Sequence, residues 1–283
     1  MSRKIVEATH PALRDDIGEL VTWRPLPGPG LPHLDPFLFL NHHGPQNYPP
    51  NNQGLPFGPH PHRGFETVTF ILEGSLEHRD SGGGASIIES GGVQWMTAGR
   101  GLVHAEVSPD AFRRQGGPLE ILQLWVNLPA RLKMIEPAYV GLQSADMPVV
   151  EEQGVRLRLI SGSWKNARGP IAPKTDIFMS VVDLASDGAL HLDGLSGRTM
   201  FLYVVAGSLL VEGAPAHERH LVSCSLSGDA LSLRAVSPSR LLLGHAPPIG
   251  EPIVSHGPFV MNSAQEIDQA MRDYRAGLFG GMP

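Results

Sequence analysis

Short runs of alternating apolar and polar residues follow one another between residues 65 and 97. The runs read ETVTFIL, LEHRD, SIIE and VQWMT, and glycine-rich turns such as SGGGA separate them. Runs of this length, rich in β-favouring residues and bounded by turn residues, are typical of an antiparallel sandwich or barrel. The stretch LEILQLWVNL continues the pattern after Gly116 and Gly117. We therefore expect this part of the chain to form an antiparallel barrel.

A second set of such runs follows later in the chain. It comprises RLRLISG, FMSVVDL, FLYVVAGSLLVEG, LVSCSL, ALSLRAV and SRLLLG. The two sets share a phrase, FILEGSLEHRD in the first and YVVAGSLLVEG in the second, in which Gly74 and Gly207 align 133 residues apart. An internal repeat of this length in two β-rich halves predicts a duplicated barrel. The expected fold class is all-β.

Prolines mark the passage from one half to the other. Pro129, Pro137 and Pro148 interrupt regular structure there and favour an extended crossover. We place the boundary near Pro137, so that residues 1–136 form the first domain and residues 137–283 the second.

The stretch NSAQEIDQAMRDYRAGLFG predicts one amphipathic helix at the end of the second domain. Asn262 or Ser263 is the expected cap, Glu266 stands in the first turn, and Gly277 ends the helix. One face of the helix is expected to pack against a barrel. That face carries Ile267, Met271 and Tyr274.

Composition and charge exclude several functional classes. The chain has 283 residues, of which 41% are hydrophobic and 18% charged, so a folded protein with its own apolar cores is expected. The net charge of −6 without a basic stripe argues against direct nucleic-acid or membrane binding. No apolar run reaches the roughly 18 residues of a membrane span, and no signal peptide is evident, so a cytoplasmic protein is expected. A nuclear location is the alternative if the source is eukaryotic.

The chain contains a single cysteine and thirteen histidines. One cysteine, Cys224, excludes an internal disulfide and a CxxC metal site, and it is consistent with a reducing compartment. We expect Cys224 to fill a core position. Any metal site must therefore use imidazole and carboxylate ligands.

The segment GPHPHRGFETVTF places His60 and His62 two residues apart, ahead of an alternating β-pattern. Side chains two apart on a strand point to the same face, so both imidazoles can reach one ion. A His-x-His pair alone arises easily by chance in a chain with this many histidines. It becomes informative only together with a second pair of ligands.

The segment TAGRGLVHAEVSP supplies such a pair in His104 and Glu106, again two residues apart. If this segment lies beside the one that carries His60 and His62, three imidazoles and one carboxylate converge on one point. The alternative is that His104 hydrogen-bonds to a turn and Glu106 is a solvated surface residue. Two such pairs on separate strands favour the metal site.

These segments resemble the two cupin motifs, and the surrounding words resemble the pirin family. The similarity rests on DPFLFLNHHGP, PFGPHPHRGFETVTFILEGSLEHRDS, GGVQWMTAGRGLVHAE, LQLWVNLP and HGPFVMN, and it extends from about Asp35 to Tyr274. It implies a bicupin of two antiparallel jelly-roll barrels with a C-terminal helix, and one metal, usually iron, in the N-terminal barrel.

By the same resemblance the metal ligands are His60, His62, His104 and Glu106. Many cupins instead use a glutamate just after the His-x-His pair, a place that Glu66 occupies here; the pirin pattern assigns Glu106, and Glu66 becomes a residue around the site. Moving the ligands by 133 residues gives a set without comparable donors, so the C-terminal barrel is expected to hold no metal. The set is Asp193, Leu195, Ser237 and Ser239.

The resemblance implies a quercetin 2,3-dioxygenase. Such an enzyme uses dioxygen to open the ring of a flavonol such as quercetin with release of carbon monoxide, and Glu106 would serve as ligand and as catalytic base. Fe(II) is the expected metal, although the donor set also suits Mn, Co, Ni, Cu or Zn. The alternative is a non-enzymatic metal- or redox-responsive protein that modulates transcription or binds another protein partner. The family similarity also implies a monomer.

Five further residues are expected around the metal. His42 and His43 would donate hydrogen bonds to ligands or substrate, with a structural turn before Gly44 as the alternative. Phe57 and Trp95 would line an aromatic-binding cavity, with core packing as the alternative. Glu66 completes the set.

Overall fold

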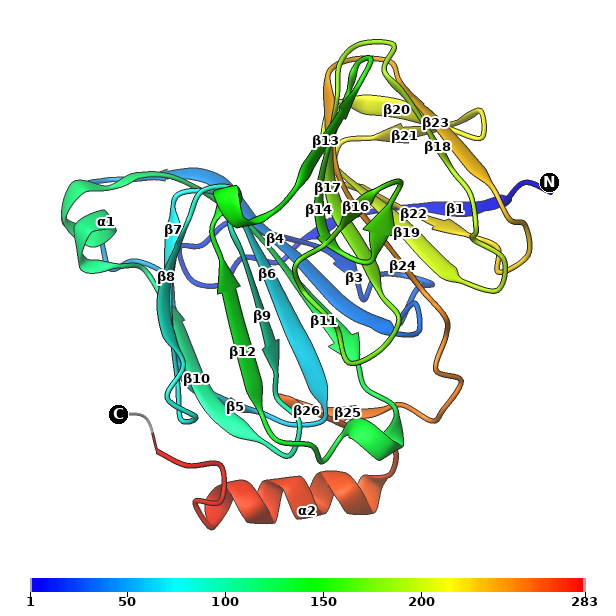
Figure 1. Cartoon of the computed structure of the whole chain (residues 1–283). Coiled ribbons are helices and arrows are strands. Elements are labelled where there is room, and N and C mark those ends of the chain that lie inside the picture. Colours follow the sequence, from blue (N-terminus) through cyan, green and yellow to red (C-terminus); the bar gives the residue numbers. More distant parts are fainter. Residues whose placement is uncertain (1, 282–283) are drawn as a thin grey trace. The chain divides into compact units, whose positions relative to one another are not determined.

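Antiparallel strands make up most of the protein, whose structure is a computed structural model that describes residues 2–281 (Figure 1). The chain divides into two compact units. We call residues 14–23, 37–145 and those from 249 onward the first barrel. Residues up to 13, 24–36 and 146–248 are the second barrel.

Two sheets build the first barrel, and several short elements join or follow them. The larger sheet has the order β12 (Ala138–Leu142), β9 (Val93–Thr97), β6 (Phe65–Glu73), β11 (Gly117–Asn127), β4 (Phe37–Tyr48), β3 (Thr22–Leu26) and β2 (Leu13–Arg14). The smaller sheet has the order β5 (Phe57–His62), β10 (Leu102–Val107), β7 (Ser75–Asp80) and β8 (Ala85–Glu89). The other elements are α1 (Asp110–Gln115), η1 (Ala130–Leu132), η2 (Ser144–Asp146), β25 (Val254–His256), β26 (Phe259–Met261) and α2 (Ala264–Arg275).

The second barrel repeats this arrangement. Its larger sheet has the order β1 (Val6–Pro11), β22 (His220–Cys224), β19 (Thr199–Ala206), β24 (Ser239–Ala246), β17 (Phe178–Leu184), β14 (Val155–Ser161) and β13 (Val149–Glu152). Its smaller sheet has the order β18 (Ala189–Leu192), β23 (Leu231–Ala235), β20 (Ser208–Val211) and β21 (Ala214–His217). A hairpin of β15 (Ser163–Trp164) and β16 (Ala167–Arg168) follows β14.

The two barrels share one topology. The strand order β9-β6-β11-β4 recurs as β22-β19-β24-β17, and β5-β10-β7-β8 recurs as β18-β23-β20-β21, so each strand corresponds to the one thirteen places later. Gly74 and Gly207 make the matching turns, with φ of 85° and 84°. The all-β fold of two antiparallel barrels predicted from the repeat is confirmed. Cys224 is buried, as expected of a core residue.

The units are not two continuous halves of the chain. β1 pairs with β22 of the second barrel, with Val6 opposite Cys224, whereas α2 contacts β25 and β26 of the first. The predicted division into 1–136 and 137–283 thus differs from these units at both ends of the chain. The difference arises because β1 gains its hydrogen bonds from a strand more than two hundred residues away, a pairing that local sequence pattern does not encode.

The C-terminal helix is confirmed at α2, which lies in red across one end of the first barrel, beside β25 and β26 (Figure 1). Ser263 caps it: its Oγ accepts a hydrogen bond from the backbone N–H of Glu266, whose carboxylate accepts one from the N–H of Asn262, 2.9 Å away. This reciprocal pair is a capping box. Ile267 and Ala270 are buried. No helix within residues 2–281 is long and apolar enough to span a bilayer.

A glycine between β5 and β6 lets the C-terminal segment approach the first barrel closely. Gly64 has φ of 88°, and a Cβ at this position would lie 2.0 Å from the carbonyl oxygen of Val260 in β26. The buried ammonium of Lys133 donates to both the Gly64 and the Val260 carbonyl oxygens, at 2.8 and 3.1 Å. Any side chain at residue 64 would force these two backbone segments apart.

We predict that Gly64→Ala lowers the free energy of unfolding by roughly 2 kcal/mol or more, because the methyl group adds a steric clash to the strain of a positive φ. Gly18→Ala is the matched control, since Gly18 has φ of 60° and no atom within 4 Å of its Cβ position. It should cost only about 1 kcal/mol. Urea denaturation measures both values, and equal losses in the two variants would contradict the role given to Val260.

Candidate metal centre

Three histidines of the first barrel converge on one point. His60 and His62 lie on β5, and His104 lies directly opposite His60 on the neighbouring strand β10. One ring nitrogen from each of the three lies within 4.8 Å of the others. β5 is the edge strand of its sheet, which is where a strand tolerates Pro59 and Pro61 without their N–H groups. The sequence PHPH thus suits an edge strand that presents two imidazoles to one side.

Hydrogen bonds from the protein fix the tautomers of two of these rings. The Nδ1 of His60 lies 2.7 Å from the Gly58 carbonyl oxygen, and the Nδ1 of His62 lies 3.3 Å from that of Pro258. A carbonyl oxygen only accepts, so both Nδ1 atoms carry the proton and donate it. Each Nε2 therefore keeps a lone pair, which is the arrangement of a metal-ligating histidine.

The third ring, His104, is fully buried, and neither of its nitrogens has a hydrogen-bond partner among residues 2–281. A buried polar atom without a partner costs on the order of 1–3 kcal/mol. Burial also lowers the pKa of His104 well below 6.5, and burial followed by the neighbouring charge of His60 lowers the pKa of His62 to about 3. Both rings are neutral at pH 7, the form that binds metals. A divalent ion bound to the three lone pairs would satisfy the orphaned nitrogen, so these residues fit a metal.

Glu106 lies near this group but is not part of it in the described structure. The cluster of donor atoms within 4.8 Å contains the three histidines only. The β5–β10 register shifts between His104 and Glu106, and a bulge of this kind redirects the side chains on either side of it. The 1% exposed carboxylate of Glu106 points instead at three donors.

Those three donors come from the facing sheet. The Thr69 hydroxyl on β6 donates to Oε1 of Glu106 at 2.8 Å, and the Gln123 amide on β11 donates to Oε2 at 2.6 Å. The Gln94 amide on β9 also donates to Oε1. The sequence analysis missed these residues, although a glutamine inside each of the apolar runs VQWMT and ILQLWVN signals a buried polar role.

A second buried cluster adjoins His104. The ring of His78 on β7 lies 5.4 Å from that of His104, and it stacks on Tyr139 with centroids 3.9 Å apart. The Nε2 of His78 hydrogen-bonds to Asp80 at 2.9 Å. The Tyr139 hydroxyl donates to Gln94 at 3.2 Å, and burial raises the pKa of Tyr139 to about 12. Tyr139 and Gln94 thus link His78 to Glu106.

Strand alternation separates the five residues expected around the metal into two groups. His43 lies on β4 two residues from Asn41, which is paired with Gln123, so it shares the inward face of Gln123. Its ring lies 5.3 Å from that of Phe57, and Phe57 pairs with Glu106. These two expected residues therefore lie with the site.

The other three point to the opposite face. Glu66 accepts a hydrogen bond from Thr97 at 2.7 Å, and it is an odd number of positions from Thr69 along a regular β6–β9 ladder. By the same alternation Trp95 lies opposite in sense to Gln94. His42 bonds to Glu120 at 2.9 Å rather than to the site. These residues support the sheet from its outer face.

An aromatic wall flanks His62 instead. The Trp125 ring lies 5.3 Å from that of His62 and 4.4 Å from that of Phe65, while Phe39 lies 4.8 Å from Trp125. Trp125 and Phe39 are half-buried and so retain accessible ring surface. The alternation Gln123, Trp125 on β11 was the signal available in the sequence.

Leucines stand in the second barrel where the first has histidines. β5 ends at His62, opposite Leu102; β18 ends at Leu192, opposite Leu231. Two residues inward, the His60–His104 pair corresponds to a pair of leucines, Leu190 and Leu233. Hydrocarbon side chains at these places offer no ligand atom.

The uniform shift of 133 residues was wrong for these strands, because two residues join β5 to β6 whereas six join β18 to β19. It pointed to residues beyond the structural equivalents. Those residues were Asp193, Leu195, Ser237 and Ser239.

Sequence and structure comparisons agree on the family. The pirin model matches residues 20–126, and the model of the pirin C-terminal cupin domain matches residues 179–280. A Pseudomonas aeruginosa protein named "putative quercetin 2,3-dioxygenase" is 41% identical over 249 residues, 87% of this chain and 87% of that protein. Pirin-1 of Arabidopsis thaliana is 41% identical over 225 residues, 77% of this chain and 76% of its own length.

Among solved structures, quercetin 2,3-dioxygenase from Acinetobacter baumannii aligns with a TM-score of 0.91 at 32% identity and covers 99% of both chains. The full-length structural match, the two family models and the identities above all lead to one assignment. The chain belongs to the pirin family of bicupin proteins.

Proposed function

We propose that the first barrel binds one divalent metal through His60, His62 and His104, with Glu106 as the adjoining carboxylate, and that this centre is the active site of a flavonol 2,3-dioxygenase. The observation that carries the proposal is the buried His104, whose two unpartnered nitrogens lie in a group of three neutral-ligand histidines. Fe(II) is the metal we expect, and quercetin the model substrate. The relatives named quercetin 2,3-dioxygenase support this choice.

When bound, the metal would supply a Lewis acid and an electron conduit between a flavonol and dioxygen. The protein supplies the rest. His60 and His62 are held in their ligating tautomers by the Gly58 and Pro258 carbonyl oxygens, so the centre is preorganised.

Glu106 is held as an acceptor for the substrate's hydroxyl proton. A carboxylate has about four lone-pair directions, and the donors Thr69, Gln94 and Gln123 engage three of them. The remaining direction is open to a metal ion or to the flavonol hydroxyl. The three donors fix the carboxylate orientation, which is what proton transfer requires of a base.

The aromatic wall supports an aromatic substrate. Phe39 and Trp125 present half-buried rings beside His62. Planar rings gain about 0.5–1.5 kcal/mol from such aromatic contacts beyond the area they bury. A flavonol is a flat polyphenol of this kind.

The direct test is aerobic turnover of quercetin by protein loaded with Fe(II), and separately with Mn, Co, Ni, Cu or Zn. We expect loss of the flavonol absorbance with carbon monoxide release, and we expect His62→Ala to lose both metal and activity because a ligand is missing. His191→Ala is the matched control, since His191 is an exposed histidine of the second barrel. Fully loaded protein that is inert with every metal would reject the dioxygenase and favour a metal-dependent binding protein.

The carboxylate clamp is tested by Gln123→Leu. Removing one donor leaves Glu106 misoriented, so kcat should fall by about 10–100-fold while the metal-to-protein ratio stays unchanged. Gln143→Leu, which alters an exposed glutamine bound to the Ile87 carbonyl oxygen, should leave kcat as in the parent. A drop in KM or metal content with kcat preserved would contradict the role of the clamp.

Acid release of the metal provides a third prediction. The folded pKa of His62 is lowered from 6.5 to about 3, so protons compete with the metal for this ring only at strongly acidic pH. Half-release should therefore occur clearly below pH 6.5. Metal content after dialysis across a pH series measures it, and half-release at the ordinary imidazole value would count against a buried His62 ligand.

A further inference from the structure

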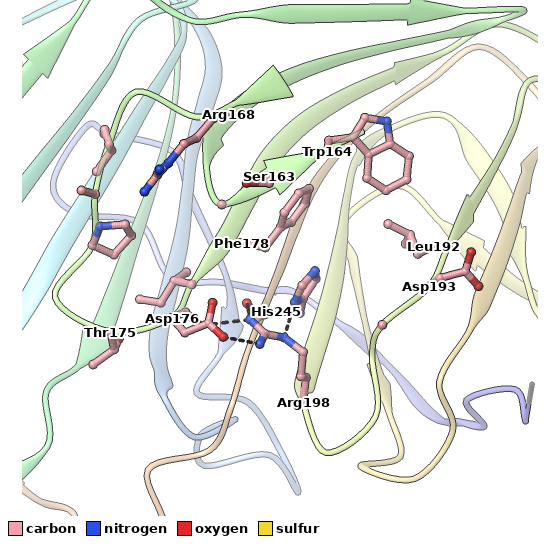
Figure 2. A pocket seen from close by; sticks show the side chains of 16 residues that line it. Ser163, Trp164, Arg168, Thr175, Asp176, Phe178, Leu192, Asp193, Arg198 and His245 are labelled. Carbon is pink, nitrogen blue, oxygen red and sulfur yellow. Dashed lines mark hydrogen bonds and ion pairs between the residues drawn. The ribbon is translucent and has the colours of Figure 1, made fainter. Parts of the chain in front are cut away.

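The second barrel contains a cavity of about 530 Å³ that none of the metal-site residues line. It lies between the β15–β16 hairpin, the start of β17 and the ends of β18 and β24 (Figure 2). Its size falls within the roughly 300–1,000 Å³ of small-molecule pockets. The cavity belongs to the barrel in which leucines replace the metal-binding histidines.

Aromatic rings form one wall of this cavity. Phe178 on β17 stacks on His245 of β24, with centroids 4.7 Å apart and planes within 3°. Trp164 in the β15–β16 hairpin approaches Phe178 at 6.2 Å, and it is half-buried (Figure 2). A flat ring from a ligand would therefore meet aromatic surface on this side.

A fixed pair of polar groups forms the floor. The Nε of Arg198 donates to Nδ1 of His245 at 2.7 Å, and its Nη1 donates to the Asp176 carboxylate at 2.5 Å (Figure 2). Because guanidinium nitrogens only donate, His245 accepts at Nδ1 and carries its proton on Nε2. Burial, reinforced by the charge of Arg198, lowers the pKa of His245 to about 3, so the ring is neutral at pH 7.

Two donors of this pair remain for a ligand. Figure 2 shows the second nitrogen of His245 on the side of the ring away from Arg198. Arg198 has five N–H groups; within the described chain, one goes to His245 Nδ1, one to the Asp176 carboxylate, and Nη2 reaches the Asp176 and His245 carbonyl oxygens. One Nη1 N–H is left, as is the Nε2 N–H of His245.

The balance of charge around the cavity favours an anion. Asp176 is already paired with Arg198, and Asp193 accepts from His191 at 3.1 Å. Arg168, on the hairpin strand β16, is exposed and has no ion pair among residues 2–281. The cavity thus combines aromatic walls, one unpaired cation and two spare N–H donors.

We propose that this cavity binds a small aromatic carboxylate, with its ring against Trp164 and Phe178 and its carboxylate directed to Arg168, Arg198 and His245. A planar carboxylate matches guanidinium donors in both shape and charge. The inference does not depend on the proposed dioxygenase activity, because no residue of the first barrel takes part. It gives the second barrel a ligand of its own.

Calorimetric titration of the metal-loaded full chain with sodium benzoate tests this site. We expect one saturable event, weakened about tenfold when benzamide, the uncharged analogue, replaces benzoate. Arg168→Ala and Trp164→Leu should each weaken benzoate binding by about tenfold as well. Arg168 is exposed and unpaired, so its removal leaves the fold intact and keeps the test decisive.

Two controls separate this site from the metal. Arg234→Gln alters another exposed arginine of the same barrel, one paired with Asp187, and should leave the affinity unchanged. His104→Gln disables the proposed metal centre and should also leave it unchanged. Absence of benzoate binding, equal binding in Arg168→Ala and Trp164→Leu, or loss of binding in His104→Gln would each overturn the proposal.

Discussion

The pairing of β5 with β10 is the constraint on which the chemistry of the first barrel depends. It sets His60 directly opposite His104, and strand alternation then brings His62 to the same side. The register shift that follows on β10 turns Glu106 away from the histidines and towards the donors of the facing sheet. One strand pair thus separates the ligands of a metal from the base that would work beside it.

The rest of the first barrel serves this geometry. The turn between β25 and β26 supplies the Pro258 carbonyl oxygen that fixes His62, and Gly64 lets the backbone of β26 come close enough to do so. Arg63 ties this turn to α2 through its hydrogen bond to Asp273 at 2.7 Å. The C-terminal segment is therefore part of the metal centre's support. The second barrel keeps the same strand order but fills the equivalent places with leucine, which frees it for a different ligand.

Local sequence pattern was enough to predict the strands, the duplication and the helix, because alternation, glycine turns and capping residues act over a few positions. It also predicted His60, His62 and His104, since ligands two apart on a strand leave a visible mark. The strand exchange of β1 could not be predicted, because it depends on a pairing across the length of the chain. The same holds for the Pro258 carbonyl oxygen, which any residue could supply, and for the register shift before Glu106.

The inward or outward direction of each side chain was the other point that required the structure. His42 and His43 are adjacent in sequence and equally plausible, yet only His43 shares the face of Gln123. Trp95 and Trp125 differ in the same way. A shift of one residue in register exchanges the two faces, and no local pattern sets the register of a strand that is buried on both sides.

X-ray absorption spectroscopy of the iron-loaded protein tests the central claim most directly, because it reports the ligands of the metal itself. We expect a first shell with three imidazole nitrogens at about 2.0–2.2 Å, completed by oxygen, and a loss of one imidazole in His104→Ala. A first shell with fewer than three imidazoles, or one unchanged in that variant, would contradict a centre built from His60, His62 and His104.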